Sequence, residues 1–154
     1  MMKETLFEII RKCHFNISIY TAEIFERRCQ EEIIRSDEDK TSFVYLEFDF
    51  KTIQSMFSNE GQNELFWEIF LESLTKNSRG SDIVGFLENN SGLGMLLLDS
   101  KIDGWNRILG RIEQIAMRRE FGAISLILPN AVRPIVYPAC IQDPSTPTAT
   151  AGAF

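Results

Sequence analysis

Residues 43–50, which read FVYLEFDF, alternate between two faces as a β-strand does, and they constrain the fold more than any other stretch. The residues at even positions are all apolar and share one face. Glu47 and Asp49 fall on the other face, together with Phe43 and Tyr45. A strand with one apolar face and one partly polar face is typical of a sheet that is packed mainly on one side.

The stretches that follow predict two helices, a hairpin, a helix and a strand, with a helical segment before the first strand. This order indicates an α+β chain with a ferredoxin-like sheet that contains antiparallel pairs and has helices mainly on one face. The expected helical segments are 3–36, 51–57, 64–74 and about 100–116. Within the first segment, residues 15–20 are ambiguous, and residues 35–40 at its end are expected to form a solvated connection. The expected strands are 43–50, 82–87, 93–98 and 123–128, with a short edge strand at 134–138.

Three regions are expected along the chain. Residues 1–36 form a helical lead-in packed on the domain, residues 37–141 form the domain itself, and residues 142–154 form a disordered tail. The length of 154 residues suits one hydrophobic core.

Composition excludes several function classes. The formal charge of −6 argues against binding to nucleic acid, which needs clustered Lys and Arg. No apolar run is long enough to span a bilayer, and Cys13, Cys29 and Cys140 with the single His14 do not make a zinc set. We therefore expect a cytoplasmic chain with reduced thiols, no metal, no cofactor and no membrane segment.

Three short runs carry a resemblance to a known family. They are LEFDFK at 46–51, RGSDIV at 79–84 and MLLLDS at 95–100. In this order they resemble the GGDEF (diguanylate cyclase) family of the nucleotide cyclase fold, over roughly residues 25–128. The resemblance implies a nucleotide-cyclase-type sheet, and in the family two carboxylates hold divalent metal against a triphosphate.

The hairpin turn departs from the family signature. Where the family has two glycines, an acidic pair and Phe, this chain carries Asn89, Asn90, Ser91, Gly92 and Leu93. Serine and glycine do not bind metal as carboxylates do, and Glu88 is an extra residue in the loop. Gly92 and Gly94 are expected to serve a tight turn. The resemblance thus implies a degenerate domain that is not an enzyme.

The remaining nucleotide and metal positions of the family fall on four polar residues. A one-residue slip places the first-strand carboxylates on Glu47 and Asp49, whereas an ungapped count places Leu46 there. The guanine-contacting positions fall on Gln54 and Asn63. The alternative for Glu47 and Asp49 is the solvent face of a strand.

The run Arg79-x-x-Asp82 resembles the inhibitory site at which the family binds cyclic di-GMP. A guanidinium forks onto phosphate, and a carboxylate accepts guanine N–H groups. The alternative is a solvated turn residue followed by a polar strand start. Arg107 and Arg111 are expected on the solvated side of their helix.

The function predicted from these features is a non-catalytic GGDEF-like regulatory or binding domain in signalling that senses cyclic di-GMP through Arg79 and Asp82. One alternative is a dimerisation or scaffold module, a homodimer through the N-terminal helices, linked by analogy to polysaccharide biosynthesis. The other alternative is a residual nucleotide cyclase.

Overall fold

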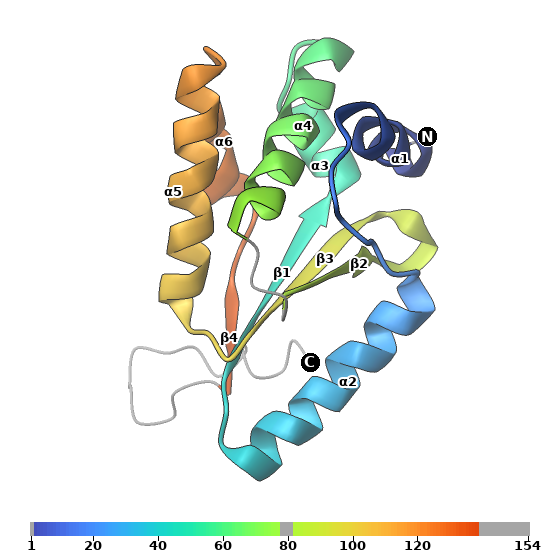
Figure 1. Cartoon of the computed structure of the whole chain (residues 1–154), viewed down its shortest axis with the longest axis vertical. Helices are drawn as coiled ribbons and strands as arrows, with labels where there is room; N and C mark the ends of the chain where they lie inside the picture. The colour runs from blue at the N-terminus through green and yellow to red at the C-terminus, as the bar shows by residue number, and fades with distance from the viewer. Residues whose placement is uncertain (1, 78–81, 139–154) are drawn as a thin grey trace.

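A computed structural model describes residues 2–77 and 82–138 of the chain. Its elements follow one another in the order expected from the sequence, with one exception near the end (Figure 1). They are α1 (Met2–Cys13), α2 (Ala22–Asp39), β1 (Phe43–Asp49), α3 (Phe50–Ser55), α4 (Glu60–Asn77), β2 (Ile83–Phe86), the 3-10 turn η1 (Glu88–Asn90), β3 (Gly92–Leu98), α5 (Ile102–Arg118), α6 (Ile124–Ala131) and β4 (Ile135–Tyr137).

The four strands form one antiparallel sheet in the order β2-β3-β1-β4. The register pairs Phe43 with Leu98 and Asp49 with Gly92, so the start of β3 lies beside the end of β1. β4 pairs with β1 at the edge of the sheet, where the short strand between two prolines was expected. The predicted α+β fold with a ferredoxin-like sheet is confirmed.

The helices α4 and α5 cover the first face of the sheet (Figure 1). An aromatic core lies between them and the strands. Phe48 of β1 lies at its centre, with ring centroids 4.6 Å from Phe70 and 6.0 Å from Trp105. Trp67 is fully buried and meets Phe48 edge to face at 6.4 Å. Each such side chain contributes about 1.5–3 kcal/mol by leaving water, so this face supplies most of the apolar burial.

The second face is covered by α2, which lies on the opposite side of the sheet from α4 and α5 (Figure 1). Phe25 of α2 is 3% exposed and lies over Gly85 and Gly94, which pair across β2 and β3. A Cβ at Gly85 would lie 2.4 Å from the Phe25 Cβ, and a Cβ at Gly94 would lie 2.3 Å from its Cε2. The two glycines therefore make the space that the ring of Phe25 occupies.

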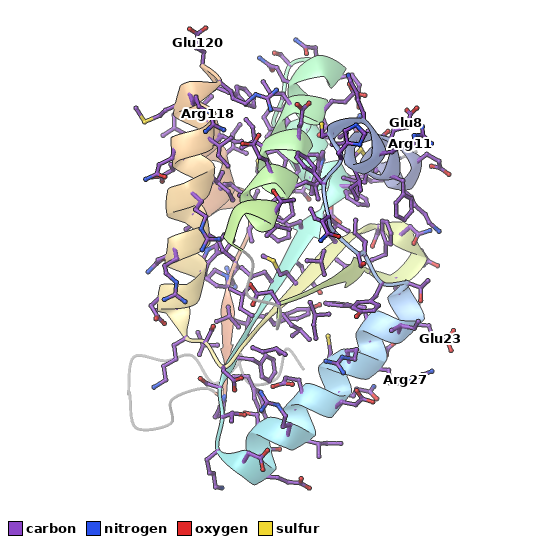
Figure 2. All side chains as sticks on the ribbon, viewed as in Figure 1. Glu8, Arg11, Glu23, Arg27, Arg118 and Glu120 are labelled. Carbon is purple, nitrogen blue, oxygen red and sulfur yellow. The ribbon has the colours of Figure 1, made fainter. Side chains whose placement is uncertain are left out.

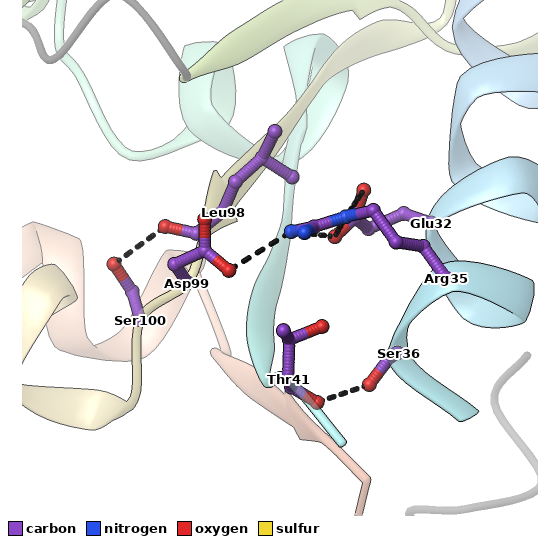
Figure 3. A network of polar contacts seen from close by, with 7 residues as sticks. All are labelled: Glu32, Arg35, Ser36, Thr41, Leu98, Asp99 and Ser100. Carbon is purple, nitrogen blue, oxygen red and sulfur yellow. Dashed lines mark hydrogen bonds and ion pairs between the residues drawn. The ribbon is translucent and has the colours of Figure 1, made fainter. Parts of the chain in front are cut away.

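A network of polar contacts fixes the end of α2 to the sheet (Figure 3). Arg35 donates from Nε to Glu32 Oε1 at 2.9 Å and from NH2 to Asp99 Oδ1 at 2.9 Å, just after β3. Ser36 donates to the carbonyl of Thr41. Glu32 is 5% exposed, so Arg35 provides the cation that a buried carboxylate needs.

The end of α2 differs from the helix boundary that the sequence predicted. Thr21 caps α2 by accepting from the Ile24 amide at 3.4 Å, as expected. The helix does not end before Arg35 but continues through Asp39 and closes on Lys40, which has a φ of 58°. The predicted solvated connection at 35–40 is therefore wrong, because Arg35 and Ser36 have partners in the fold.

The predicted strand at 123–128 is wrong, because the structure has the helix α6 there. Ile124 and Leu128 are buried one helical turn apart, while Leu126 between them is 75% exposed. Pro129 lies inside the helix, although it was expected to end a strand. A short apolar run has no period that distinguishes a helix from a strand, and the fourth strand position is filled by residues 135–137.

Within the described ranges, no helix has the length and apolar character needed to cross a bilayer.

Candidate functional site

The tip of the β2–β3 hairpin is built from two asparagines with left-handed backbone. Asn89 has a φ of 58° and Asn90 a φ of 54°. Asparagine is among the residues that best tolerate this conformation. The Asn90 amide donates to the Leu87 carbonyl at 2.9 Å, and the Ser91 amide donates to the Glu88 carbonyl at 3.2 Å. Asparagine therefore fills the two positions where the family resemblance places glycine.

Gly92 is needed for close packing and not for the turn, which corrects the role expected for it. None of the glycines in the described ranges has a positive φ. Gly92 lies opposite Asp49, and a Cβ there would be 2.3 Å from the backbone oxygen of Phe48. No side chain fits at position 92 without displacing β1. The next residue, Leu93, is fully buried in the core.

A groove of about 680 Å³ lies beside this tip, between α2 and the second face of the sheet, and we call it the α2 groove. Glu47 and Asp49 line it, whereas Leu46 is fully buried on the other face. The one-residue slip is thus the alignment that brings carboxylates next to the tip. The other lining residues are Ala22, Glu23, Phe25, Glu26, Cys29, Gln30, Ile33, Tyr45, Phe86, Leu87, Glu88, Asn89 and Ser91.

Both first-strand carboxylates are already engaged. Tyr45 donates its hydroxyl to Glu47 Oε2 at 2.5 Å, and burial followed by this hydrogen bond raises the pKa of Tyr45. Asp49 Oδ2 caps α3 by accepting from the Thr52 amide at 2.9 Å and hydroxyl at 2.8 Å. The part of the chain that the structure describes has no group of three His, Cys, Asp or Glu placed to hold a metal ion.

Gln54 and Asn63, which the family resemblance assigns to guanine contacts, both donate hydrogen bonds to Glu60. Gln54 Nε2 donates to Glu60 Oε2 and Asn63 Nδ2 donates to Glu60 Oε1, each at 3.2 Å. Asn63 is 1% exposed, because α1 covers it and brings Met2 Sδ to 3.5 Å from its Nδ2. The structure therefore joins Gln54 to Asn63 but leaves both outside the lining of the α2 groove.

Asp82 precedes β2 and lines a small hollow of about 20 Å³ with Ser100, Arg107 and Arg111, which we call the Asp82 hollow. Its predicted companion Arg79 lies outside the described residues. Arg107 has an ion pair with Asp103 at 3.4 Å. The two arginines of α5 were expected only on a solvated face, and their place beside Asp82 was not predicted. Their spacing of four residues, which places both on one helix side, was the available signal.

Comparison with known proteins finds similarity in three-dimensional structure. No protein-family model matches the sequence, and no curated protein matches it. The GGDEF domain of YfiN (TpbB) from Pseudomonas aeruginosa matches over 79% of this chain and 78% of its own, with a TM-score of 0.50 and 20% identity. A shortened form of that protein, comprising only the GGDEF domain, matches over 79% and 73% with a TM-score of 0.51 and 18% identity. The fold is that of a GGDEF domain.

The GGDEF-type fold expected from the sequence is therefore confirmed. A further match is the diguanylate cyclase SiaD of P. aeruginosa, solved in complex with its activator SiaC. It has a TM-score of 0.44 and 17% identity over 62% of this chain, and this chain spans 37% of the SiaD chain. In the GGDEF fold of this chain, the α2 groove lies between the first strand and the hairpin tip, and the Asp82 hollow lies at the start of the hairpin.

Proposed function

We propose that this chain is a non-catalytic GGDEF-fold domain that binds a ligand and passes on a signal. The observation that carries the proposal is the packing at Gly92. Because the Phe48 oxygen occupies the space of a side chain at this position, no carboxylate extends from it toward the groove. Ser91, the other residue at the acidic pair, donates its hydroxyl to the Glu88 carbonyl at 2.9 Å.

The family resemblance implies that two carboxylates, one from the first strand and one from the hairpin turn, hold the divalent metal against the triphosphate. In this chain the first-strand side offers Glu47 and Asp49, which already have partners, and the acidic-pair positions of the hairpin offer a hydroxyl and a glycine. The carboxylate that the hairpin does bring to the groove, Glu88, is an extra residue of the turn and stands outside that pair. We therefore expect no turnover of GTP with Mg²⁺ or Mn²⁺. Turnover that is lost in Glu47→Gln or Asp49→Asn would overturn the proposal and establish the chain as a residual cyclase.

The Asp82 hollow supports a cyclic dinucleotide as the ligand, with cyclic di-GMP the first candidate. Its floor combines a carboxylate, which accepts guanine N–H groups, with two guanidinium groups, which fork onto phosphate oxygens. Arg111 has no ion-pair partner among residues 2–77 and 82–138. Arg79 belongs to the same proposed site by its place in the sequence.

The test is calorimetric titration of the whole chain with cyclic di-GMP. We expect binding that Asp82→Asn, Arg79→Ala and Arg111→Ala each weaken by at least about tenfold, because each removes a charge-assisted hydrogen bond. Arg27→Ala, which breaks an exposed ion pair with Glu23, serves as the control and keeps wild-type affinity. Absence of heat from the wild-type chain at millimolar ligand would remove cyclic di-GMP from the proposal.

A dimerisation module is the second candidate, and exposed apolar side chains on the N-terminal helices favour it. Ile34 is 58% exposed and Ile24 41% exposed on α2, and Phe7 is 42% exposed on α1. A homodimer through these helices would bury them. Sedimentation at rising concentration is the test, and Ile34→Asp is expected to shift a dimer to monomer. A monomer at all concentrations would eliminate this candidate.

A further inference from the structure

The α2 groove differs from a nucleotide site in the sign of its charge. Among the described residues, its lining carries five carboxylates, those of Glu23, Glu26, Glu47, Asp49 and Glu88, and no Lys, Arg or His. They come from three elements: α2, β1 and η1. A phosphate entering this groove would be repelled, whereas a group of cations would be attracted from every wall.

Little in the fold offsets this charge. Glu23 pairs with Arg27 at 3.7 Å, at the rim of the groove, and Figure 2 shows both on the same side of α2. Glu47 and Asp49 accept hydrogen bonds from neutral groups, which leave their charge in place. Glu26 and Glu88 have no ion pair within the described part of the chain. The pKa of the Cys29 thiol is raised to about 12, first by burial and then by the negative charges of Glu26 and Glu47. The carboxylates of the groove therefore act on this thiol as well.

The floor of the groove is apolar and aromatic. Phe25 and Tyr45 stack with ring centroids 6.4 Å apart, and Ile33 and Leu87 complete the apolar lining. Lysine and arginine side chains match such a surface, because their methylene stems pack on apolar groups while their charged ends reach carboxylates or aromatic faces.

We infer that the α2 groove is the docking site for a basic segment of a partner protein, one that carries several Lys or Arg residues. We infer a basic segment because its positive charges complement the carboxylates that line the groove. The carboxylates are spread over three walls, so one small cation would meet only part of them. Residues 139–154 of this chain contain no Lys or Arg and therefore do not supply the segment. The inference shares with the proposed function the absence of nucleotide chemistry in the groove, but it does not depend on cyclic di-GMP.

The experiment measures fluorescence anisotropy of a labelled peptide that alternates arginine with leucine, added to the full chain at physiological salt. We expect binding that the double variant Glu26→Gln/Glu88→Gln weakens by about tenfold, since both residues face the groove. The control is Glu31→Gln/Glu113→Gln, which changes the net charge equally but lies outside the groove lining. It is expected to keep the wild-type affinity within about twofold. Thermal melting of all three proteins checks that they are folded.

Three outcomes overturn the inference. Equal weakening in the groove and control variants would mean attraction to the net charge alone, and no binding by the wild type would leave the groove without a basic occupant. Displacement of the peptide by GTP with Mg²⁺ would make the groove a nucleotide site, and accompanying GTP turnover would also end the proposed function. Binding of cyclic di-GMP without binding of the peptide would leave the proposed function standing and remove only this inference.

Discussion

The two faces of the sheet share the same strands but are closed in different ways. The first face is sealed by α4 and α5 over interlocking aromatic rings, and Phe48 at its centre is fully buried. The second face is closed by one helix, α2, whose Phe25 enters a space made by Gly85 and Gly94. Beyond Phe25 this face stays open as the α2 groove, where Glu47 of β1 is exposed.

This difference separates stability from recognition. Close packing of apolar side chains gives the first face its share of the folding free energy and leaves no room for a ligand among the buried rings. The second face has fewer buried side chains, and it places polar and charged groups where a partner or ligand reaches them. Substitutions on the two faces should therefore differ in size and in what they change.

The largest expected effect is on the first face. Phe48→Ala removes a ring that contacts Phe70, Trp67 and Trp105, and we expect the free energy of unfolding to fall by about 3–5 kcal/mol. Glu26→Gln on the second face is expected to change it by less than about 0.5 kcal/mol. Urea denaturation measures both. A loss below about 1 kcal/mol for Phe48→Ala would contradict the division between the faces.

The glycine floor under Phe25 provides a second, smaller test. Gly94→Ala sets a methyl group against the ring, and we expect a loss of about 1–3 kcal/mol. In a Phe25→Ala background the same substitution should cost much less, because the ring it meets is gone. The double-mutant cycle measures this coupling.

Gly110→Ala on α5 is the control, since a Cβ there meets nothing within 4 Å. It should raise stability by about 0.5–1 kcal/mol. Additive effects of Gly94→Ala and Phe25→Ala would show that α2 does not dock through this contact.

The network at the end of α2 is expected to contribute less, because Arg35 is 37% exposed. Arg35→Ala leaves the buried carboxylate of Glu32 without its cation, and we expect a loss of about 1–2 kcal/mol in chemical denaturation. Arg28→Ala breaks a more exposed ion pair with Glu31 and should cost less than about 0.5 kcal/mol. Equal losses for the two variants would show that the network in Figure 3 is no stronger than a surface pair.

The contrast between the faces also explains what the sequence could predict. The alternation in β1 and the helical period in α5 are local patterns, and both elements were predicted correctly, as was the hairpin. The helix α6 was missed because its apolar run is too short to show a period. The α2 groove and the Asp82 hollow each join segments that are distant in the sequence. The geometry of the α2 groove depends on packing at Gly85, Gly92 and Gly94, and no local pattern reports this packing.

The smallest effect expected is a pH dependence that arises at the floor of the α2 groove. Burial first, and the nearby carboxylates of Glu26 and Glu47, raise the pKa of Cys29 to about 12, whereas an unfolded cysteine has a pKa of about 8.5. Below about pH 8.5 the thiol is protonated in both states and the full stability is present. As pH rises above that value the unfolded chain loses the proton while the folded chain keeps it, so stability falls.

We expect this thiol, which is only partly buried, to account for about 1 kcal/mol of the loss between about pH 8.5 and pH 10, and Cys29→Ser to remove that part. The measurement is the free energy of unfolding of both proteins at closely spaced pH values. Tyr45, whose pKa is raised as well, keeps some slope in the variant at higher pH, so the difference between the two profiles is the quantity to compare. Parallel profiles would show that water and counterions reach Cys29 freely. In that case the α2 groove would be too open for its carboxylates to act together on a ligand.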